Sequence, residues 1–132
     1  MAIEYRDTQQ FEIDQLADLF DSIKWESARY PDKLRSALAQ SHRVFSAWDG
    51  QRLVGLINAL SDNVMTVYFH YLLVHPAYQK IGIGRTLVKM MLDAYADYYK
   101  KVLIADGPAQ NFYRRCGFTP ACTATPMYLI TE

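Results

Sequence analysis

Two closely spaced glycines are the first feature of this sequence that could bind a ligand. Gly82 and Gly84 follow a strand-like run and precede a stretch with helical periodicity. Glycine adopts positive φ readily and lets backbone N–H groups approach an anion closely. Because the first turn of a helix also carries unpaired N–H groups, this position could bind a pyrophosphate. A plain tight turn into a helix accounts for the same two residues equally well.

Two nucleotide-binding motifs compete for this glycine loop. A dinucleotide fingerprint needs a third glycine where this chain has Leu87, although Asp106 stands about 20 residues further on, where a ribose-binding acid belongs. The preceding strand ends near Val74, too far before Gly82 for the tight turn of that fold. A Walker loop would require Gly-Lys-Ser or Gly-Lys-Thr, which the chain lacks. An NAD-binding domain is therefore kept only as an alternative.

Three short motifs occur in a fixed order over about residues 68–118. They are Leu72-Leu-Val-His-Pro76, Gln79-x-x-Gly-x-Gly84 and Phe112-Tyr113-x-x-x-Gly117-Phe118. Together they resemble the motifs of the GNAT superfamily of N-acetyltransferases, the second being similar to its coenzyme A loop. Ala109 also matches the third motif, whereas the Asn that begins this motif in the family is Asp106 here.

The resemblance implies an acyltransferase that moves an acetyl group from acetyl-coenzyme A to a primary amine by direct attack. It places the coenzyme between the strand ending at Val74 and the strand at residues 102–105, with the pantetheine arm on backbone groups of Leu72, Leu73 and Val74. The pyrophosphate would lie on the backbone of Gln79, Lys80, Ile81, Gly82, Ile83, Gly84 and Arg85, and further coenzyme contacts would come from Asp106, Ala109 and Phe112. A non-catalytic module that binds or senses acetyl-coenzyme A is the main alternative.

Two side chains are candidates for proton transfer. The resemblance implies that Tyr113 is the general acid, because a phenol can protonate the departing thiolate. Residues 67–74 contain no carboxylate, and His70 has a suitable intrinsic pKa for the base. Taken by alternation, His70 shares a strand face with Leu72 and Val74. A water relay without a single base, and plain packing roles for Tyr113 and His70, are the alternatives left open.

The acceptor would contact the segment between the first two predicted helices. Trp25, Glu26 and Tyr30 combine aromatic rings with an acid, which would suit a cationic amine, although ordinary packing explains them too. The sequence leaves open whether this amine belongs to a small molecule or to a peptide. The three histidines lack the spacing of metal ligands, so no metal site is predicted.

Composition limits the remaining possibilities. The chain has 132 residues, of which 51% are hydrophobic, and its 14 basic residues balance 14 acidic ones. This balance argues against nucleic acid as a partner. The sequence also lacks a secretory signal or an apolar run of the ~18 residues that span a bilayer. With Cys116 and Cys122 as reduced thiols, we expect a cytoplasmic protein without a membrane partner.

The pattern of the sequence predicts a single mixed α/β domain over residues 1–132. Helices are expected after Asp7 or Thr8, after Pro31, after the glycine loop and at residues 109–116. Strands are expected at residues 3–5, 43–48, 53–60, 65–74 and 102–105, followed by a closing pair from residue 118 and at residues 127–130. The resemblance implies a GNAT-like sheet of about six to seven strands with about four helices. The strand at residues 127–130 would offer a homodimer edge.

Overall fold

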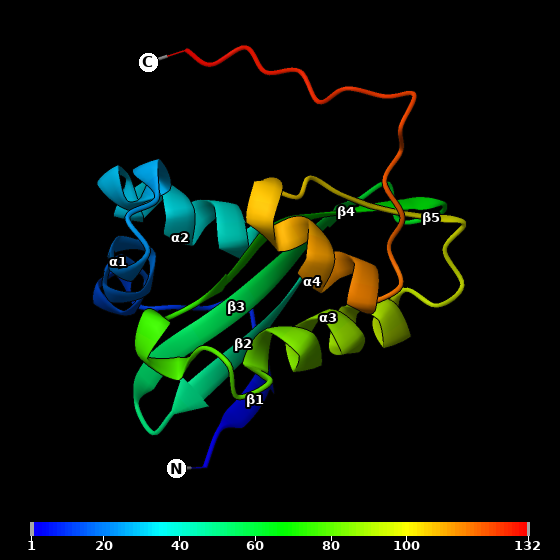
Figure 1. Cartoon of the computed structure of the whole chain (residues 1–132). Coiled ribbons are helices and arrows are strands. Elements are labelled where there is room, and N and C mark those ends of the chain that lie inside the picture. Colours follow the sequence, from blue (N-terminus) through cyan, green and yellow to red (C-terminus); the bar gives the residue numbers. More distant parts are fainter. Residues whose placement is uncertain (1, 132) are drawn as a thin grey trace. The chain divides into compact units, whose positions relative to one another are not determined.

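The computed structural model describes residues 2–131, and Figure 1 traces the chain through it. The chain divides into two compact units, one reaching to Val102 and one starting at Leu103. The described strands are β1 (Glu4–Asp7), β2 (Arg43–Asp49), β3 (Arg52–Ser61), β4 (Thr66–Val74) and β5 (Lys100–Leu103). The helices are α1 (Ile13–Ser22), α2 (Pro31–Ala39), α3 (Ile83–Ala94) and α4 (Gln110–Arg115), with short 3-10 turns η1 (Glu26–Arg29), η2 (Pro76–Tyr78) and η3 (Gly107–Ala109).

The sheet follows the chain, in the order β1-β2-β3-β4-β5. The first four strands pair antiparallel with their neighbours. A two-residue turn is predicted at Asp49-Gly50, but Asp49 pairs with Arg52, so the hairpin turns one residue later, at Gly50 and Gln51. β5 joins β4 after the connection through α3, the strand–helix–strand arrangement of a parallel pair, so the sheet is mixed. The mixed α/β GNAT-like fold is thus confirmed, with five strands in place of the expected six to seven.

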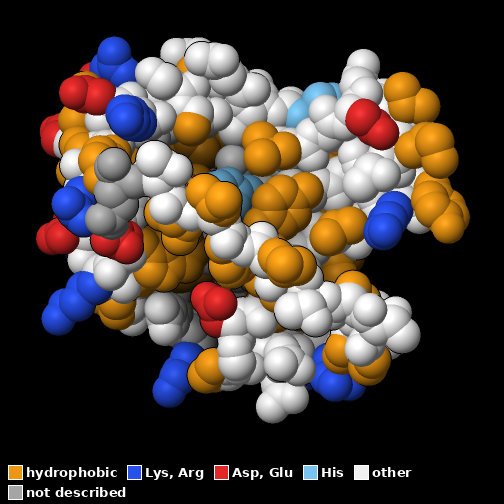
Figure 2. All heavy atoms as spheres, turned by 90° about the horizontal axis from the view of Figure 1, so that it is seen from above, with side chains coloured by type: hydrophobic (Ala, Val, Ile, Leu, Met, Phe, Trp, Pro, Cys, Tyr) orange, Lys and Arg blue, Asp and Glu red, His pale blue; other side chains and the backbone are white. Residues whose placement is uncertain are grey.

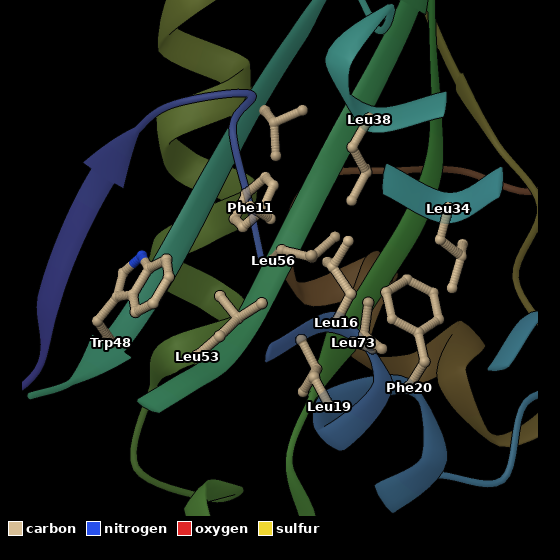
Figure 3. Close-up of a cluster of buried hydrophobic side chains, with 11 residues drawn as sticks. Phe11, Leu16, Leu19, Phe20, Leu34, Leu38, Trp48, Leu53, Leu56 and Leu73 are labelled. Carbon is tan, nitrogen blue, oxygen red and sulfur yellow. The ribbon is translucent and has the colours of Figure 1, made fainter. Parts of the chain in front are cut away.

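A hydrophobic core lies between the sheet and helices α1 and α2, which cover the same face (Figure 1). Figure 3 shows Leu16, Leu19 and Phe20 of α1 pointing into this core. All three are fully buried. Burial of each such side chain contributes about 1.5–3 kcal/mol, so α1 is held mainly by this packing.

Helix α3 packs on the opposite face of the sheet and is attached at both ends. Near its start, Ile83 lies against Gly55 of β3, where a Cβ on the glycine would stand only 3.2 Å from Ile83 Cγ2. At its end, the Tyr95 hydroxyl donates to His42 Nδ1 over 2.6 Å, and His42 Nε2 donates to Asn63 Oδ1 over 2.9 Å. Both contacts join α3 to loops and strands distant in the sequence.

Some predicted helix boundaries are wrong, and the contacts explain why. Asp7 does not cap α1, because it belongs to β1 and pairs with Phe45. Helix α1 instead begins six residues later, with Glu12 as its N-terminal flanking residue. The apolar pattern after the glycine loop predicts a third helix that continues to Tyr99, but this helix ends at Ala94, and Tyr99 is exposed.

The predicted closing strands do not form among the described residues, and Pro126 supplies a physical reason. The Ala124 amide donates to the Ala121 carbonyl over 3.0 Å, which forms a tight turn. In a hairpin with this turn, residues 119 and 126 would form the next hydrogen-bonded pair. Proline has no N–H to donate there, so this hydrogen bond of the ladder is missing before residues 127–130.

Figure 2 shows acidic and basic side chains interspersed with hydrophobic ones on one face. Within residues 2–131, no helix combines the length and apolar character required to cross a bilayer.

Candidate functional site

A β-bulge interrupts β4 at the candidate site. Ile57 pairs with Leu72 and Ala59 pairs with Phe69, so two residues of β4 stand opposite Asn58 alone. These two residues are His70 and Tyr71. Such a bulge bends the strand and redirects its side chains.

Asn58 holds the bulge in place from β3. Its Oδ1 accepts from the Tyr71 amide over 2.7 Å, and its Nδ2 donates to Ser41 Oγ over 3.1 Å. Asn58 is only 2% exposed, so its side chain is satisfied by these partners rather than by water. The sequence prediction missed this residue, although a single amide within an apolar strand is a signal for a specific buried role.

Because of the bulge, the orientation of His70 differs from the predicted one. Before the bulge, Phe69 contacts Tyr95 at the end of α3, whereas after it Tyr71 contacts Phe20 of α1 on the opposite face. Simple alternation therefore fails across this segment, and the prediction that His70 shares a face with Leu72 and Val74 is wrong. Instead, the His70 ring stacks on Tyr71 at 4.1 Å between centroids and on Tyr68 at 5.5 Å.

The stacked histidine has an altered protonation equilibrium. Although His70 is exposed, partial desolvation of its ring lowers its pKa below the ordinary value of 6.5, because a charged imidazolium loses hydration there. The neutral form of the ring is therefore the major form at pH 7. A neutral imidazole can accept a proton, which is the property required of a general base.

The last residues of β4 turn backbone groups away from β3. The His75 amide donates to the Val54 carbonyl of β3 over 2.8 Å. Because backbone groups alternate along a strand, those of Leu73 also face β3, whereas those of Leu72 and Val74 face the other edge. The Val74 carbonyl accepts from Gln79 Nε2 over 2.9 Å. The Leu72 groups and the Val74 N–H therefore lie along the edge of β4 that faces away from β3.

The glycine loop leads from this strand into α3. Lys80 and Gly82 both adopt positive φ, at 69° and 94°. The first bond inside the helix runs from the Thr86 amide to the Gly82 carbonyl over 3.0 Å. The amides of Ile83, Gly84 and Arg85 therefore precede the helical ladder and have no acceptor within the helix.

The loop is rigidly attached on the side of β2. The Tyr78 hydroxyl donates to Asp49 Oδ2 over 2.5 Å, and this bond raises the pKa of Tyr78. Beyond it, the charged ends of Lys80 and Arg85 are exposed. The loop thus offers backbone donors beside two solvent-exposed cations, an arrangement suited to an anion.

The second unit contains the remaining predicted residues, in and before α4. The Tyr113 ring contacts Phe112 at 5.1 Å and Phe118 at 6.1 Å between centroids. Burial, with smaller contributions from Cys116 and Asp106, raises the pKa of Tyr113 to about 12. Its hydroxyl is therefore protonated at neutral pH and could donate a proton.

Asp106 and Ala109 lie at the two ends of η3. Asp106 precedes the turn as its N-terminal flanking residue. Its carboxylate makes no capping hydrogen bond within residues 2–131, whereas its backbone carbonyl accepts from the Ala109 amide over 2.7 Å. Asp106 therefore acts in this turn through its main chain.

The three predicted acceptor residues occupy different environments. Trp25 packs against Phe20 and lies 5.9 Å from the Tyr71 ring, beside the bulge. Glu26 instead pairs with Arg29 over 3.0 Å. The Tyr30 ring is contacted by Arg29 and Lys33. Glu26 and Tyr30 therefore already interact with cations of the chain itself.

Ser27 was not predicted and connects the acceptor segment with the bulge. Its hydroxyl and that of Tyr71 share a hydrogen bond of 3.1 Å. No signal in the sequence indicates this contact, because it joins residues 44 positions apart.

In the part of the chain that the structure describes, no cluster of three potential metal ligands occurs.

Comparison with known sequences identifies related proteins over most of the chain. The model of the acetyltransferase (GNAT) family matches residues 9–118. An uncharacterized N-acetyltransferase, ycf52, of Porphyra purpurea is 28% identical over 117 residues, which cover 84% of this chain and 67% of the relative.

Solved structures show the same fold. A GNAT family acetyltransferase from Streptococcus pneumoniae is 28% identical, with a TM-score of 0.85 and 99% of each chain covered. A structure described as a putative acetyltransferase from Deinococcus radiodurans is 25% identical, with a TM-score of 0.82, covering 97% of this chain and 87% of its own.

We predict that Asn58→Ala disturbs the bulge and destabilises the folded protein. The Tyr71 amide loses its acceptor, which should lower the free energy of unfolding by about 1–3 kcal/mol. Denaturant titration measures this loss. Ser41→Ala is the matched control, because it removes the other partner of Asn58 while the Tyr71 bond remains. Equal His70 ring shifts in NMR spectra of both variants would contradict the assigned role of Asn58.

Proposed function

The chain belongs to the GNAT acetyltransferase family, and we propose that it transfers an acetyl group from acetyl-coenzyme A to a primary amine. The observation that carries this proposal is the combination of two sets of backbone groups in the first unit. One set is the outward-facing edge of β4 at Leu72 and Val74, and the other is the group of unpaired amides at the start of α3.

These two sets suit different parts of the cosubstrate. The amides of Ile83, Gly84 and Arg85, with the exposed charges of Lys80 and Arg85, favour a pyrophosphate. The backbone of Leu72 and Val74 can pair with the amides of a pantetheine arm, as an added strand would. Both sets belong to one unit, so the proposed binding of the cosubstrate by these backbone groups does not depend on the second unit.

We assign two of the proton transfers in this reaction to His70 and Tyr113. His70 removes a proton from the incoming ammonium, which frees the nitrogen lone pair to attack the thioester carbonyl. The carbon–sulfur bond then breaks, Tyr113 donates its proton to the departing thiolate, and the attacking nitrogen loses its second proton to solvent. The products are the N-acetylated amine and free coenzyme A. His70 then releases its proton to solvent, and the Tyr113 phenolate takes up a proton from solvent.

A binding module without catalysis is the second candidate. Its support is that β4 carries no carboxylate, so His70 is the only side chain on this strand suited to act as a base. Cys116 and Cys122 are not joined in a disulfide, which is compatible with a reducing compartment, and a cytoplasmic location stays a prediction.

Ligand-dependent thermal unfolding tests the proposed function first. Acetyl-coenzyme A at ~100 times its dissociation constant should stabilise the fold by about 2.7 kcal/mol, or several degrees. NAD and ATP serve as controls. Release of free thiol with a panel of amines then separates the two candidates, because a binding module would be stabilised without turnover. No shift with acetyl-coenzyme A would exclude both.

Tyr113→Phe should slow the chemical step while leaving cosubstrate binding unchanged. Loss of the general acid should lower kcat about 100-fold or more. Steady-state kinetics measures this effect, and calorimetry should give the same Kd for acetyl-coenzyme A. Tyr99→Phe, at an exposed position, is the control and should behave as wild type. An unchanged kcat in Tyr113→Phe would remove this residue from the mechanism.

The pH dependence of kcat/KM should report His70. Because partial desolvation lowers the pKa of His70, activity should rise with pH through a value below 6.5 and then level off near neutrality. The high pKa of Tyr113, about 12, predicts no loss of the acid on the alkaline side up to about pH 9.

Two substitutions separate His70 from the other histidines. His70→Gln should slow turnover at pH 7.5 by at least about tenfold and remove the acidic limb. His42→Gln should retain this limb, since His42 is engaged with Tyr95 and Asn63. Persistence of the limb in His70→Gln would assign the base to water or another group.

A further inference from the structure

The imidazole of His75 lies between two hydrogen-bond donors at the point where β4 leads into the glycine loop. His75 directly follows the last residue of β4. Its Nδ1 accepts from the Ala77 amide over 3.0 Å and so caps the turn η2. Its Nε2 lies 3.0 Å from Nη2 of Arg52 on β3. A backbone amide and a guanidinium can only donate, so both partners require a lone pair on the ring.

The neutral imidazole of His75 cannot accept from both donors at once. It carries one N–H and one nitrogen lone pair, so a single ring nitrogen accepts in each tautomer. When Nδ1 accepts from Ala77, the proton on Nε2 faces the guanidinium of Arg52. When Nε2 accepts from Arg52, the proton on Nδ1 faces the Ala77 amide. Arg52 and Ala77 therefore compete for the one lone pair of this ring.

The bond to Ala77 holds the beginning of the glycine loop on a fixed support. The His75 amide donates to the Val54 carbonyl over 2.8 Å, and the His75 carbonyl accepts from the Tyr78 amide over 2.8 Å. The main chain of His75 is thus attached to β3, and its ring attaches η2 to this point. Lys80, which adopts positive φ, follows the turn within the loop. Loss of the Ala77 bond therefore gives the loop more freedom where it leaves β4.

Arg52 is kept within reach of His75 by helix α1. Its Nε donates to Asp18 Oδ2 over 3.1 Å. Its Nη2 is the group beside the imidazole, so one guanidinium contacts both α1 and the end of β4. A charged donor forms a stronger hydrogen bond than a neutral amide does. Arg52 therefore draws the lone pair of His75 away from Ala77.

We propose that Arg52 regulates the glycine loop: by competing for His75 it weakens the hold on Ala77 and lowers the affinity of the loop for the cosubstrate. A loop that is held firmly loses less freedom when a ligand binds, so a stronger Ala77 bond favours binding. The inference rests on the proposed function, because acetyl-coenzyme A is the ligand concerned. His75 is a positioning residue, which acts on the cosubstrate through the backbone of the loop. A purely structural role of Arg52 would have the opposite sign, since its loss would then loosen the loop.

The first experiment follows the competition in the full chain without ligand, by NMR at pH 7.5. Arg52→Met should slow hydrogen exchange of the Ala77 amide about two- to tenfold, the range that one hydrogen bond contributes. The ring nitrogens of His75 should shift toward the tautomer that is protonated at Nε2. Arg43→Met, which removes the same charge from the ion pair with Asp7, is the control and should change neither signal. Unchanged or faster exchange of Ala77 in Arg52→Met overturns the proposal.

His75→Asn tests whether the competition acts through the single lone pair of the ring. An asparagine oxygen can accept from the backbone N–H two residues further on, and its two lone pairs can serve two donors. Ala77 should therefore stay protected, and adding Arg52→Met should have no further effect on its exchange. His75→Leu removes the acceptor and should leave Ala77 unprotected. An equal effect of Arg52→Met in the native and His75→Asn backgrounds overturns the competition. Circular dichroism confirms that each variant is folded.

Calorimetry then measures the Kd for acetyl-coenzyme A in the same variants. Arg52→Met also removes a positive charge, so its effect is compared between the native and His75→Asn backgrounds. The affinity should rise about two- to tenfold more in the native background. Equal changes in both backgrounds overturn the regulation of the loop. A wild-type chain that does not bind acetyl-coenzyme A refutes the proposed function and the effect on affinity together, whereas the exchange of Ala77 still decides whether Arg52 competes for His75.

Discussion

The hydrogen bond from the Tyr71 amide to Asn58 is the contact on which the candidate site depends. It fixes an extra residue in β4, so the side chains on either side of the bulge face opposite layers of the protein. Phe69 can therefore pack toward α3 while Tyr71 packs toward α1. Without this irregularity, alternation would direct His70 away from Tyr71, and the stacked rings beside Trp25 could not form.

Most of the fold was predictable because it depends on local signals. The turn beside Gly50, the proline at the start of α2 and the apolar period of α3 each define an element from a few neighbouring residues. The predictions were wrong where a distant partner decides the structure. Asp7 resembles a helix cap, but pairing with Phe45 draws it into a strand. Near the end of the chain, the apolar pattern predicted a strand at residues 127–130, and this prediction did not take account of the missing N–H of Pro126.

The candidate site was predictable to a different degree in each part. The glycine loop follows from its motif, because positive φ at Gly82 and free helix amides are properties of a short segment. The surroundings of His70 were not predictable, since a bulge depends on pairing with another strand. Trp25 lies beside Tyr71 as a site residue should, whereas Glu26 and Tyr30 are engaged by cations close to them in the chain, a contact that composition alone does not reveal.

The attachment of α3 at both ends has a consequence for ligand binding. Gly55 admits the start of the helix closely against β3, and the bond from Tyr95 to His42 secures its end. The backbone of α3 therefore loses its conformational freedom when the protein folds. A ligand at the first turn would meet donors that are already in position, so little further ordering would oppose its association. Folding alone therefore arranges the donors that an anion would bind.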